Sequence, residues 1–482
     1  MRKYQIVFLI LGSLCIGIAG LAGLSAILSA YIFEDGVAPA FLEAVFVSGF
    51  LGGTLILFGQ DARPEIDYRG AVALTAGAWI GIPLLAAIPF TASAVGLSWT
   101  DALFESYSGI TTTGSTVMTG LDETAPSILL WRALLQWIGG IGIIGLSIAI
   151  LPFLRVGGMQ LFQMESSKPT ADQVIARPGH LAGIIAALYI GLTALCLFGY
   201  AATGMSGFEA LTHAMTTVST GGYSTHDSSM GGFSAGAQWV AIIFMLSGAV
   251  PFLAYVRVFS RADGRRGIDE EVSGFLMIVA LFTGLLVFAQ HGMDSAPMEQ
   301  LRLALFSTVS IITTTGYAAG DYQLWGPLAL SSVFILTFLG GCAGSTSGGF
   351  KTFRLQIALK AVRRALNQAS MPNAIATEQH AGRTLKDSDV ASVVLFGGLY
   401  VGTFAVGAVL LAAMGLDFET AITASATALA NVGPGLGDII GPAGHFLTLP
   451  DPAKWLLCAV MLMGRLELVV ILLLFTPRFW MR

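Results

Sequence analysis

Charged side chains are scarce in this chain. Lys, Arg, Asp and Glu make up 11% of its 482 residues, whereas soluble domains carry about 25%. The four cysteines, Cys15, Cys196, Cys342 and Cys458, all fall in apolar runs, and the six histidines lack metal-ligand spacing. The composition therefore argues against a soluble enzyme, a disulfide-stapled scaffold and a zinc site.

Long apolar runs are the dominant feature instead, because 55% of the residues are hydrophobic. A run of about 18 apolar residues crosses a bilayer as a helix, and the alternating pattern of a barrel strand is absent. The run from Ile6 is longer than a signal-peptide core, so we expect a retained helix. The sequence predicts an all-α integral membrane protein with ten spanning segments, near residues 5–33, 40–60, 69–90, 127–152, 180–203, 236–258, 272–291, 327–349, 390–414 and 454–476.

The basic residues predict the orientation of these spans. With the N-terminus in the cytoplasm and alternating spans, 20 of the 24 Lys and Arg residues fall on the inner side. The outer side then carries a formal charge of −13 and the inner side +8. An outer field of that sign concentrates cations near the membrane.

Four segments of the sequence align without a gap. Each begins with Ala-Leu or Ala-Ile, reaches a glycine twelve residues later, and lies between two apolar spanning runs. The aligned segments are ALFESYSGITTTG (102–114), ALTHAMTTVSTGG (210–222), ALFSTVSIITTTG (304–316) and AITASATALANVG (421–433). We therefore predict an N-terminal transmembrane helix pair (1–62) and pore units 1 to 4 (63–165, 166–266, 267–380 and 381–482).

Each repeated unit reads as helix, short non-spanning stretch, helix. Non-helical backbone at membrane depth is tolerated only where it is buried in protein or lines water. Four such stretches around one axis would form a pore lined by Thr, Ser, Gly and Asn backbone, and rings of carbonyls can replace the hydration shell of potassium. The alternative is a set of re-entrant loops that pack a transporter core, with Ser and Thr bonding across helices.

The strings TTTGS, STGGY, TTTGY and NVGPG together resemble the TrkH/KtrB/HKT superfamily of potassium transporters, and are closest to its TrkH branch. The resemblance covers essentially the whole chain, including the N-terminal helix pair that TrkH has and KtrB lacks. Gly114 stands where sodium-preferring plant members carry serine, which points to potassium. The resemblance implies a potassium-binding filter made of Thr111, Thr112, Thr113, Gly114, Ser219, Thr220, Gly221, Gly222, Thr313, Thr314, Thr315, Gly316, Ala430, Asn431, Val432 and Gly433.

Two features of these strings leave questions open. The fourth string contains Asn431 and Val432 but no threonine, so the ring is chemically uneven and its selectivity could be looser. In the second string Gly221 precedes Gly222, and a shift of one residue would reassign the carbonyls that face the ion. The twelve-residue spacing favours Gly222.

The predicted span near 327–349 ends in the run GGCAGSTSGGFK (340–351). Glycines propagate a helix poorly, so we expect a break at membrane depth that lines the pore. The resemblance implies an intramembrane gating loop at 340–349, below the filter, whereas a static kink with close helix packing is the alternative. The implied gate residues are Gly344, Ser345, Thr346, Ser347, Gly348, Gly349, Lys351 and Arg465.

Arg465 lies inside the last predicted span. A charged side chain near the bilayer centre is costly, so it should face the interior of the bundle. We expect it to project into the pore and slow ion passage; the alternative is an arginine that bonds carbonyls at the ends of pore helices. Glu467 should point elsewhere, because residues i and i+2 do not share a helix face.

The resulting prediction is potassium uptake across the cell membrane through a gated, carbonyl-lined filter. A secondary active transporter with a midplane substrate or ion site at the broken helix is the alternative. We expect no enzymatic activity, no cofactor beyond potassium as the transported ion, and no nucleic-acid partner. The resemblance implies a bacterial inner-membrane protein, a homodimer, and a cytosolic nucleotide-binding regulatory subunit of the TrkA type.

Overall fold

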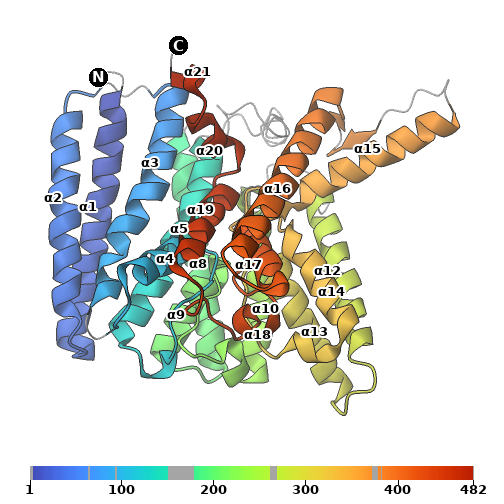
Figure 1. The fold of residues 1–482 in the computed structure, drawn as a ribbon, viewed down its shortest axis with the longest axis horizontal. Helices are drawn as coiled ribbons and strands as arrows, with labels where there is room; N and C mark the ends of the chain where they lie inside the picture. Colours follow the sequence, from blue (N-terminus) through green and yellow to red (C-terminus); the bar gives the residue numbers. More distant parts are fainter. Residues whose placement is uncertain are drawn as a thin grey trace.

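The structure is a computed structural model that describes residues 4–62, 66–92, 95–149, 178–260, 269–371, 378–381 and 383–480. Long helices run side by side, and both termini lie at the same end of the molecule (Figure 1). Among the described residues, seven helices are long and apolar enough to cross a membrane. The predicted boundaries near residues 63, 165 and 266 lie outside the described ranges.

The N-terminal pair consists of α1 (Gln5–Leu28), extended by a π-helical turn (Ser29–Phe33), and α2 (Ala38–Gly59). The two helices touch through glycine. A Cβ atom on Gly12 would lie 2.7 Å from the carbonyl oxygen of Gly52, and one on Gly52 would lie 2.9 Å from that of Gly12. Small residues at a helix crossing let the backbones approach closely, which is how helices associate in lipid. The pair stands at one edge of the molecule (Figure 1).

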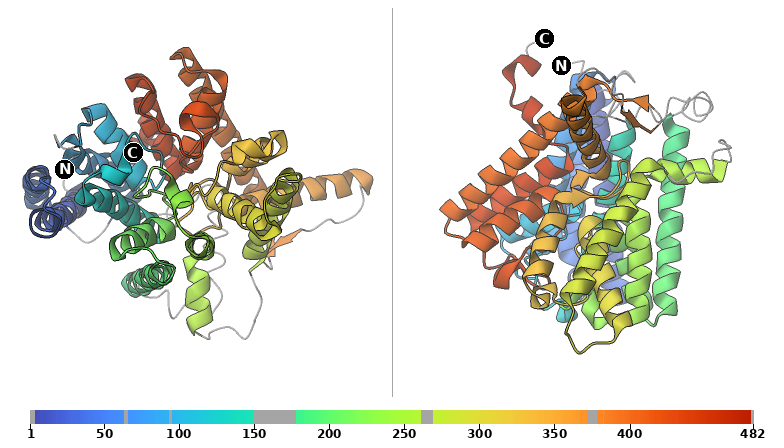
Figure 2. Two further views of the ribbon diagram at one scale, coloured as in Figure 1. Left: turned by 90° about the horizontal axis from the view of Figure 1, so that it is seen from below. Right: turned by 90° about the vertical axis from the view of Figure 1, so that its right-hand side faces the viewer.

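Four units follow, each with a pore helix of 12 to 16 residues between two other helices. Viewed from below Figure 1, they succeed one another around a centre in chain order (Figure 2, left). Unit 1 contains α3 (Tyr68–Ala86), α4 (Trp99–Ile110) and α5 (Pro126–Ala149), and unit 2 contains α8 (Pro178–Ala202), α9 (Gly207–Val218), α10 (Ala235–Ala249) and α11 (Phe252–Ser260). Unit 3 contains α12 (Glu270–Ala289), α13 (Pro297–Ile312), α14 (Pro327–Phe338) and α15 (Thr352–Ser370). Unit 4 contains α16 (Asp387–Ala413), α17 (Phe418–Ala430), α18 (Gly437–Ile440), α19 (Asp451–Arg465), α20 (Val469–Leu474) and α21 (Pro477–Trp480).

The pore helices α4, α9, α13 and α17 begin where the sequence supplies helix-start residues. The side chains of Ser98, Ser206 and Asp417 each accept a hydrogen bond from the backbone N–H three residues later. Such caps satisfy donors that the first helical turn leaves unpaired. The helix α13 begins instead at Pro297, whose missing N–H costs nothing at this position.

Two predicted continuous spans, 236–258 and 454–476, are interrupted, which corrects their ranges, and the break expected in the span 327–349 is present. The segment 236–258 splits into α10 and α11 around Pro251, because proline lacks the N–H and clashes with the preceding turn. The segment 327–349 is helical only to Phe338. The segment 454–476 breaks after Arg465, and Glu467 adopts a left-handed conformation with φ of 56°.

The glycine-rich segment 341–349 is a loop closed at its base. The strand β1 (Leu339–Gly340) pairs in parallel with β2 (Phe350–Lys351), just before α15 begins. A second pair, β3 (Gln379–His380) and β4 (Arg383–Thr384), is antiparallel and precedes α16. The helix α15 projects away from the bundle (Figure 1).

Candidate functional site

Each pore helix leads into a strand with the same unusual backbone. We call residues 111–114, 219–222, 313–316 and 430–433 the pore strands of units 1 to 4. In each strand a non-glycine residue has φ between 51° and 58°, and the glycine two positions later has φ between 78° and 110°. The non-glycine residues are Thr112, Thr220, Thr314 and Asn431, and the glycines are Gly114, Gly222, Gly316 and Gly433. This register aligns Gly222, and not Gly221, with the other three glycines.

The four pore strands close into a ring. A Cβ atom on each of these glycines would collide with the carbonyl oxygen of the residue that precedes the glycine in the next unit. The separations are 2.3 Å from Gly114 to Gly221, 1.8 Å from Gly222 to Thr315, 1.9 Å from Gly316 to Val432 and 2.8 Å from Gly433 to Thr113. Only glycine fits both this close approach and the positive φ.

Most hydroxyl groups of the pore strands form hydrogen bonds within the protein, whereas that of Thr112 has no hydrogen-bond partner among the described residues. Thr111 donates to the carbonyl of Tyr107 at 2.7 Å, and its oxygen lies 2.7 Å from that of Thr113. The equivalent pair in unit 3 repeats this pattern. In unit 4 the Asn431 side-chain amide donates to Thr113 at 2.9 Å, so the threonine-poor strand is bonded to unit 1.

Two tyrosines brace the ring from behind. Tyr223 follows Gly222 and donates to the carbonyl of Glu105 in the preceding unit at 2.8 Å. Tyr317 follows Gly316, and its hydroxyl lies 2.5 Å from that of Thr216. The sequence interpretation singled out neither Tyr223 nor Glu105, although a carboxylate in a half-apolar pore helix was a visible signal.

The loop 341–349 lies directly against two pore strands. Gly348 N–H donates to the Thr314 hydroxyl at 2.7 Å, and the hydroxyls of Thr220 and Thr346 are 3.2 Å apart. The loop is also bonded to the break in unit 2, where Thr346 N–H donates to the Gly248 carbonyl at 3.1 Å. The loop thus contacts the two left-handed threonines of units 2 and 3.

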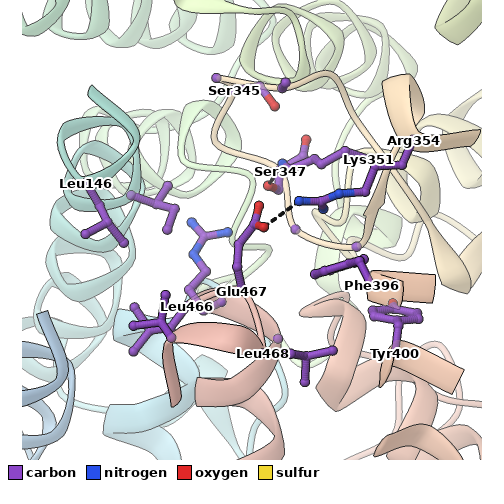
Figure 3. A pocket seen from close by; sticks show the side chains of 18 of the residues that line it. Leu146, Ser345, Ser347, Lys351, Arg354, Phe396, Tyr400, Leu466, Glu467 and Leu468 are labelled. Carbon is purple, nitrogen blue, oxygen red and sulfur yellow. Dashed lines mark hydrogen bonds and ion pairs between the residues drawn. The ribbon is translucent and has the colours of Figure 1, made fainter. Parts of the chain in front are cut away.

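A small pocket of about 60 Å³ lies between this loop and the break after α19. Arg465 Nη1 donates to the carbonyl of Thr346 at 2.9 Å, and within the described residues its Nε and Nη2 atoms have no hydrogen-bond partner. Lys351 donates to the Ser347 carbonyl, and Arg354 pairs with Glu467 (Figure 3). Arg465 therefore bonds a carbonyl of the loop. Glu467 pairs with another unit, but the helix ends at Arg465, so the helix-face argument from the sequence does not apply to it.

A vestibule of about 340 Å³ opens on the opposite side of the ring. The four glycines Gly114, Gly222, Gly316 and Gly433 all line its floor. Its wall includes Arg132, His226 and His445. A hydrated ion in this vestibule would meet the ring of pore strands next.

His226 ties units 1 and 2 together at the vestibule wall, and its contribution should depend on pH. Burial alone would lower its pKa, but hydrogen bonds with Asp122 and Glu209 outweigh burial and raise the pKa. The hydrogen bond from His226 lowers the pKa of Asp122. The stabilisation is therefore present in mildly acidic solution, and it is lost as pH rises through the raised pKa of His226 or falls through the lowered pKa of Asp122.

We expect His226→Ala to lower the free energy of unfolding by at most about 1 kcal/mol near pH 6, because the pair is partly exposed, and by less near pH 9. Thermal unfolding of the purified protein at both pH values measures this difference. His445→Ala, in the same vestibule, leaves the pairs of His226 with Asp122 and Glu209 intact and is the matched control. Equal destabilisation by His226→Ala at both pH values would contradict the assignment.

The four units bring their pore strands together in one ring, with the vestibule on one side and the loop 341–349 on the other. This arrangement defines a pore-forming membrane transport protein. The chain belongs to the TrkH family of cation transport proteins, whose family model matches residues 38–481. Members of this family are transporters and not enzymes.

Individual relatives match over nearly the full chain. The Trk system potassium uptake protein TrkI of Halomonas elongata is 44% identical over 84% of this chain and 83% of its own length. The potassium uptake protein TrkH of Escherichia coli strain K12 is 36% identical over 94% of each chain. The crystal structure of the potassium transporter TrkH from Vibrio parahaemolyticus matches with a TM-score of 0.90 at 33% identity, covering 99% of this chain and 100% of that one. The predicted all-α membrane fold with four pseudo-fourfold units is confirmed.

Proposed function

We propose that this protein takes up potassium across the cell membrane through a filter formed by the four pore strands. The ring of pore strands at the floor of the vestibule is the observation that carries the proposal. Except for that of Thr112, its threonine and serine hydroxyls form hydrogen bonds within the protein, which leaves backbone carbonyls as the main oxygens available to a dehydrated ion. The names of the relatives, which are potassium uptake proteins, support the choice of ion.

The loop 341–349, with Lys351 and Arg465, serves as the gate of this pore. The loop touches the pore strands from the side opposite the vestibule. Three cationic side chains, Lys351, Arg354 and Arg465, lie beside it with two carboxylates: Glu467, and Glu271, which accepts a hydrogen bond from the Ala343 N–H of the loop at 2.7 Å. Positive charge below a cation filter opposes cation passage. Moving the loop would break its bonds to Thr220, Thr314 and Arg465 together.

The vestibule faces outward, the termini face the cytoplasm, and the membrane is the bacterial inner membrane. The excess of basic residues on the side of the termini supports this orientation. The protein acts as a homodimer with a cytosolic nucleotide-binding subunit of the TrkA type, which would act on the inner side, where α15 projects.

Uptake of ⁸⁶Rb⁺ into proteoliposomes containing the full chain tests the proposal. Unlabelled potassium should compete with rubidium, while sodium and lithium should compete weakly, and liposomes without protein are the control. Absence of both rubidium and potassium uptake would refute the proposal. Uptake that strictly requires an imposed proton or sodium gradient would instead support a secondary active transporter.

A further inference from the structure

A buried ion pair lies directly behind the pore strands of units 1 and 2. Arg132 Nε on α5 is 2.7 Å from a carboxylate oxygen of Glu105 on the pore helix α4, and both side chains are almost fully buried. Burying two charges is costly, and their attraction offsets that cost only when the remaining donors and acceptors are also satisfied. The other hydrogen-bond partners of Glu105 and Arg132 therefore show which parts of the chain the pair holds in place.

The carboxylate of Glu105 holds the chain that leaves Gly114. It accepts hydrogen bonds from the Val117 N–H at 3.0 Å and from the Thr116 hydroxyl at 3.0 Å. Hydrogen bonds to an ionised carboxylate are stronger than neutral ones. The exit of the unit 1 pore strand is thus fixed to its own pore helix.

The guanidinium of Arg132 holds the corresponding chain of unit 2. Its Nη1 donates to the carbonyl of Ser224 at 2.9 Å, and its Nη2 donates to the Thr116 hydroxyl at 3.1 Å. Its Cζ lies 4.1 Å from the centre of the Tyr223 ring, which is a cation–π contact. One planar side chain therefore connects the chains that follow Gly114 and Gly222.

A second side chain of α5, one turn further along the helix, also bonds to the pore strand of unit 2 and the residue that follows it. Gln136 Nε2 donates to the carbonyl of Gly221 at 2.6 Å, and its Oε1 accepts from the Tyr223 N–H at 3.0 Å. The carbonyl of Gly221 is also the group that packs against Gly114 in the ring. Displacing α5 would therefore displace a carbonyl of the ring itself.

The other three units carry no charge at the position of Glu105. In the gapless alignment of the repeats, the residues equivalent to Glu105 are His213, Ser307 and Ala424. The contact between units 2 and 3 uses the neutral Tyr317 hydroxyl bonds to Thr216 and His213 instead. The contact between units 1 and 2 is therefore braced differently from the contact between units 2 and 3.

We propose that Glu105 and Arg132 are positioning residues that hold the pore strands of units 1 and 2 at a fixed separation and thereby set the discrimination between potassium and sodium. This proposal rests on the proposed function of the pore. Whether carbonyl rings select by cavity size or by the number and field of their dipoles, selectivity requires that the carbonyls keep their places. Fully satisfied buried polar networks rigidify a structure in this way.

The test combines Glu105→Gln and Arg132→Gln in the full chain, with ⁸⁶Rb⁺ uptake into proteoliposomes competed by potassium or sodium. Both variants should lower the preference for potassium over sodium severalfold, because both remove the same brace. Glu105→Gln should in addition raise the half-saturating rubidium concentration relative to Arg132→Gln, because it leaves an uncompensated positive charge at the vestibule wall. The two substitutions change the local charge in opposite directions. A loss of the preference for potassium over sodium in both variants therefore indicates the lost brace and not the changed charge as the cause.

A second buried pair on the same pore helix provides the matched control. Asp101, one turn before Glu105, pairs with Lys454 at 2.5 Å and, among the described residues, forms no hydrogen bond or ion pair with a pore strand. Asp101→Asn should lower thermal stability and leave the potassium preference unchanged. An unchanged preference in folded Glu105→Gln and Arg132→Gln, or an equal loss in Asp101→Asn, would overturn the proposal.

Arg132→Lys keeps the positive charge and is the variant least disruptive to folding. It removes the planar guanidinium group whose two terminal nitrogens reach Ser224 and Thr116. Its structure by electron cryo-microscopy should show the chains after Gly114 and Gly222 displaced relative to each other. Unmoved chains would overturn the proposal even if the wild-type protein took up no rubidium. Absence of wild-type uptake on its own counts only against the proposed function.

Discussion

Gly316→Ser should reduce the preference for potassium over sodium by about tenfold, which corresponds to about 1.4 kcal/mol of discrimination. Gly316 has φ of 78°, a conformation that an L-residue with a side chain rarely adopts. A Cβ atom there would lie 1.9 Å from the carbonyl oxygen of Val432 and 2.7 Å from Cδ of Pro434. The unit 4 strand would have to move, and its carbonyls with it. The ratio of potassium to sodium concentrations that halve ⁸⁶Rb⁺ uptake measures the effect.

Gly320→Ser is the control for this experiment. Gly320 lies four residues further along the same segment, and the nearest atom to an added Cβ would be a Leu303 methyl at 3.7 Å, an ordinary contact. Its ion preference should match that of the wild type. A folded Gly316→Ser protein that retained full discrimination would show that the ring of pore strands does not select the ion.

Arg465→Gln should raise the rate of rubidium uptake by about tenfold, the equivalent of removing about 1.4 kcal/mol from the barrier. The variant removes a buried positive charge next to the pore strands and shortens the side chain that bonds Thr346 in the loop. The loop keeps its bonds to Thr220 and Thr314, so the gate should become weaker and not disappear. Initial rates in proteoliposomes at matched protein density measure the change.

Arg465→Lys separates charge from geometry in the same position. It keeps the positive charge, so its rate should stay closer to that of the wild type than the rate of Arg465→Gln. Unchanged or abolished uptake in folded Arg465→Gln protein would contradict a role for this arginine in the gate. It would favour the reading in which Arg465 only satisfies a buried carbonyl.

Local patterns in the sequence predict most elements of the fold, but not every break. The four pore helices follow from the gapless repeats, and the caps Ser98, Ser206 and Asp417 mark where three of them begin. The break in unit 2 carries a local signal too, Pro251, which a hydrophobicity window averages away. The break after Arg465 has no such signal, because Glu467 pairs with Arg354, 113 residues away along the chain.

The candidate site also contains parts that the sequence predicts and parts that it does not. The pore strands and the glycine-rich loop could be named from their strings, because backbone freedom is encoded by the residues themselves. The contacts behind the ring could not, because Arg132 reaches Ser224 across 92 positions and Gln136 reaches Gly221 across 85. A single sequence without homologues contains no information on which distant polar groups meet.

The pairing of β1 with β2 has a consequence for the speed of gating. It joins the two ends of the loop 341–349, so the loop is already closed on itself before it meets the pore strands. Most of the conformational entropy that a free segment would lose on closing has therefore been lost in advance. In the proposed gate, the loop would leave and return as a preformed body, and each gating cycle would exchange a few hydrogen bonds without refolding a segment of the chain.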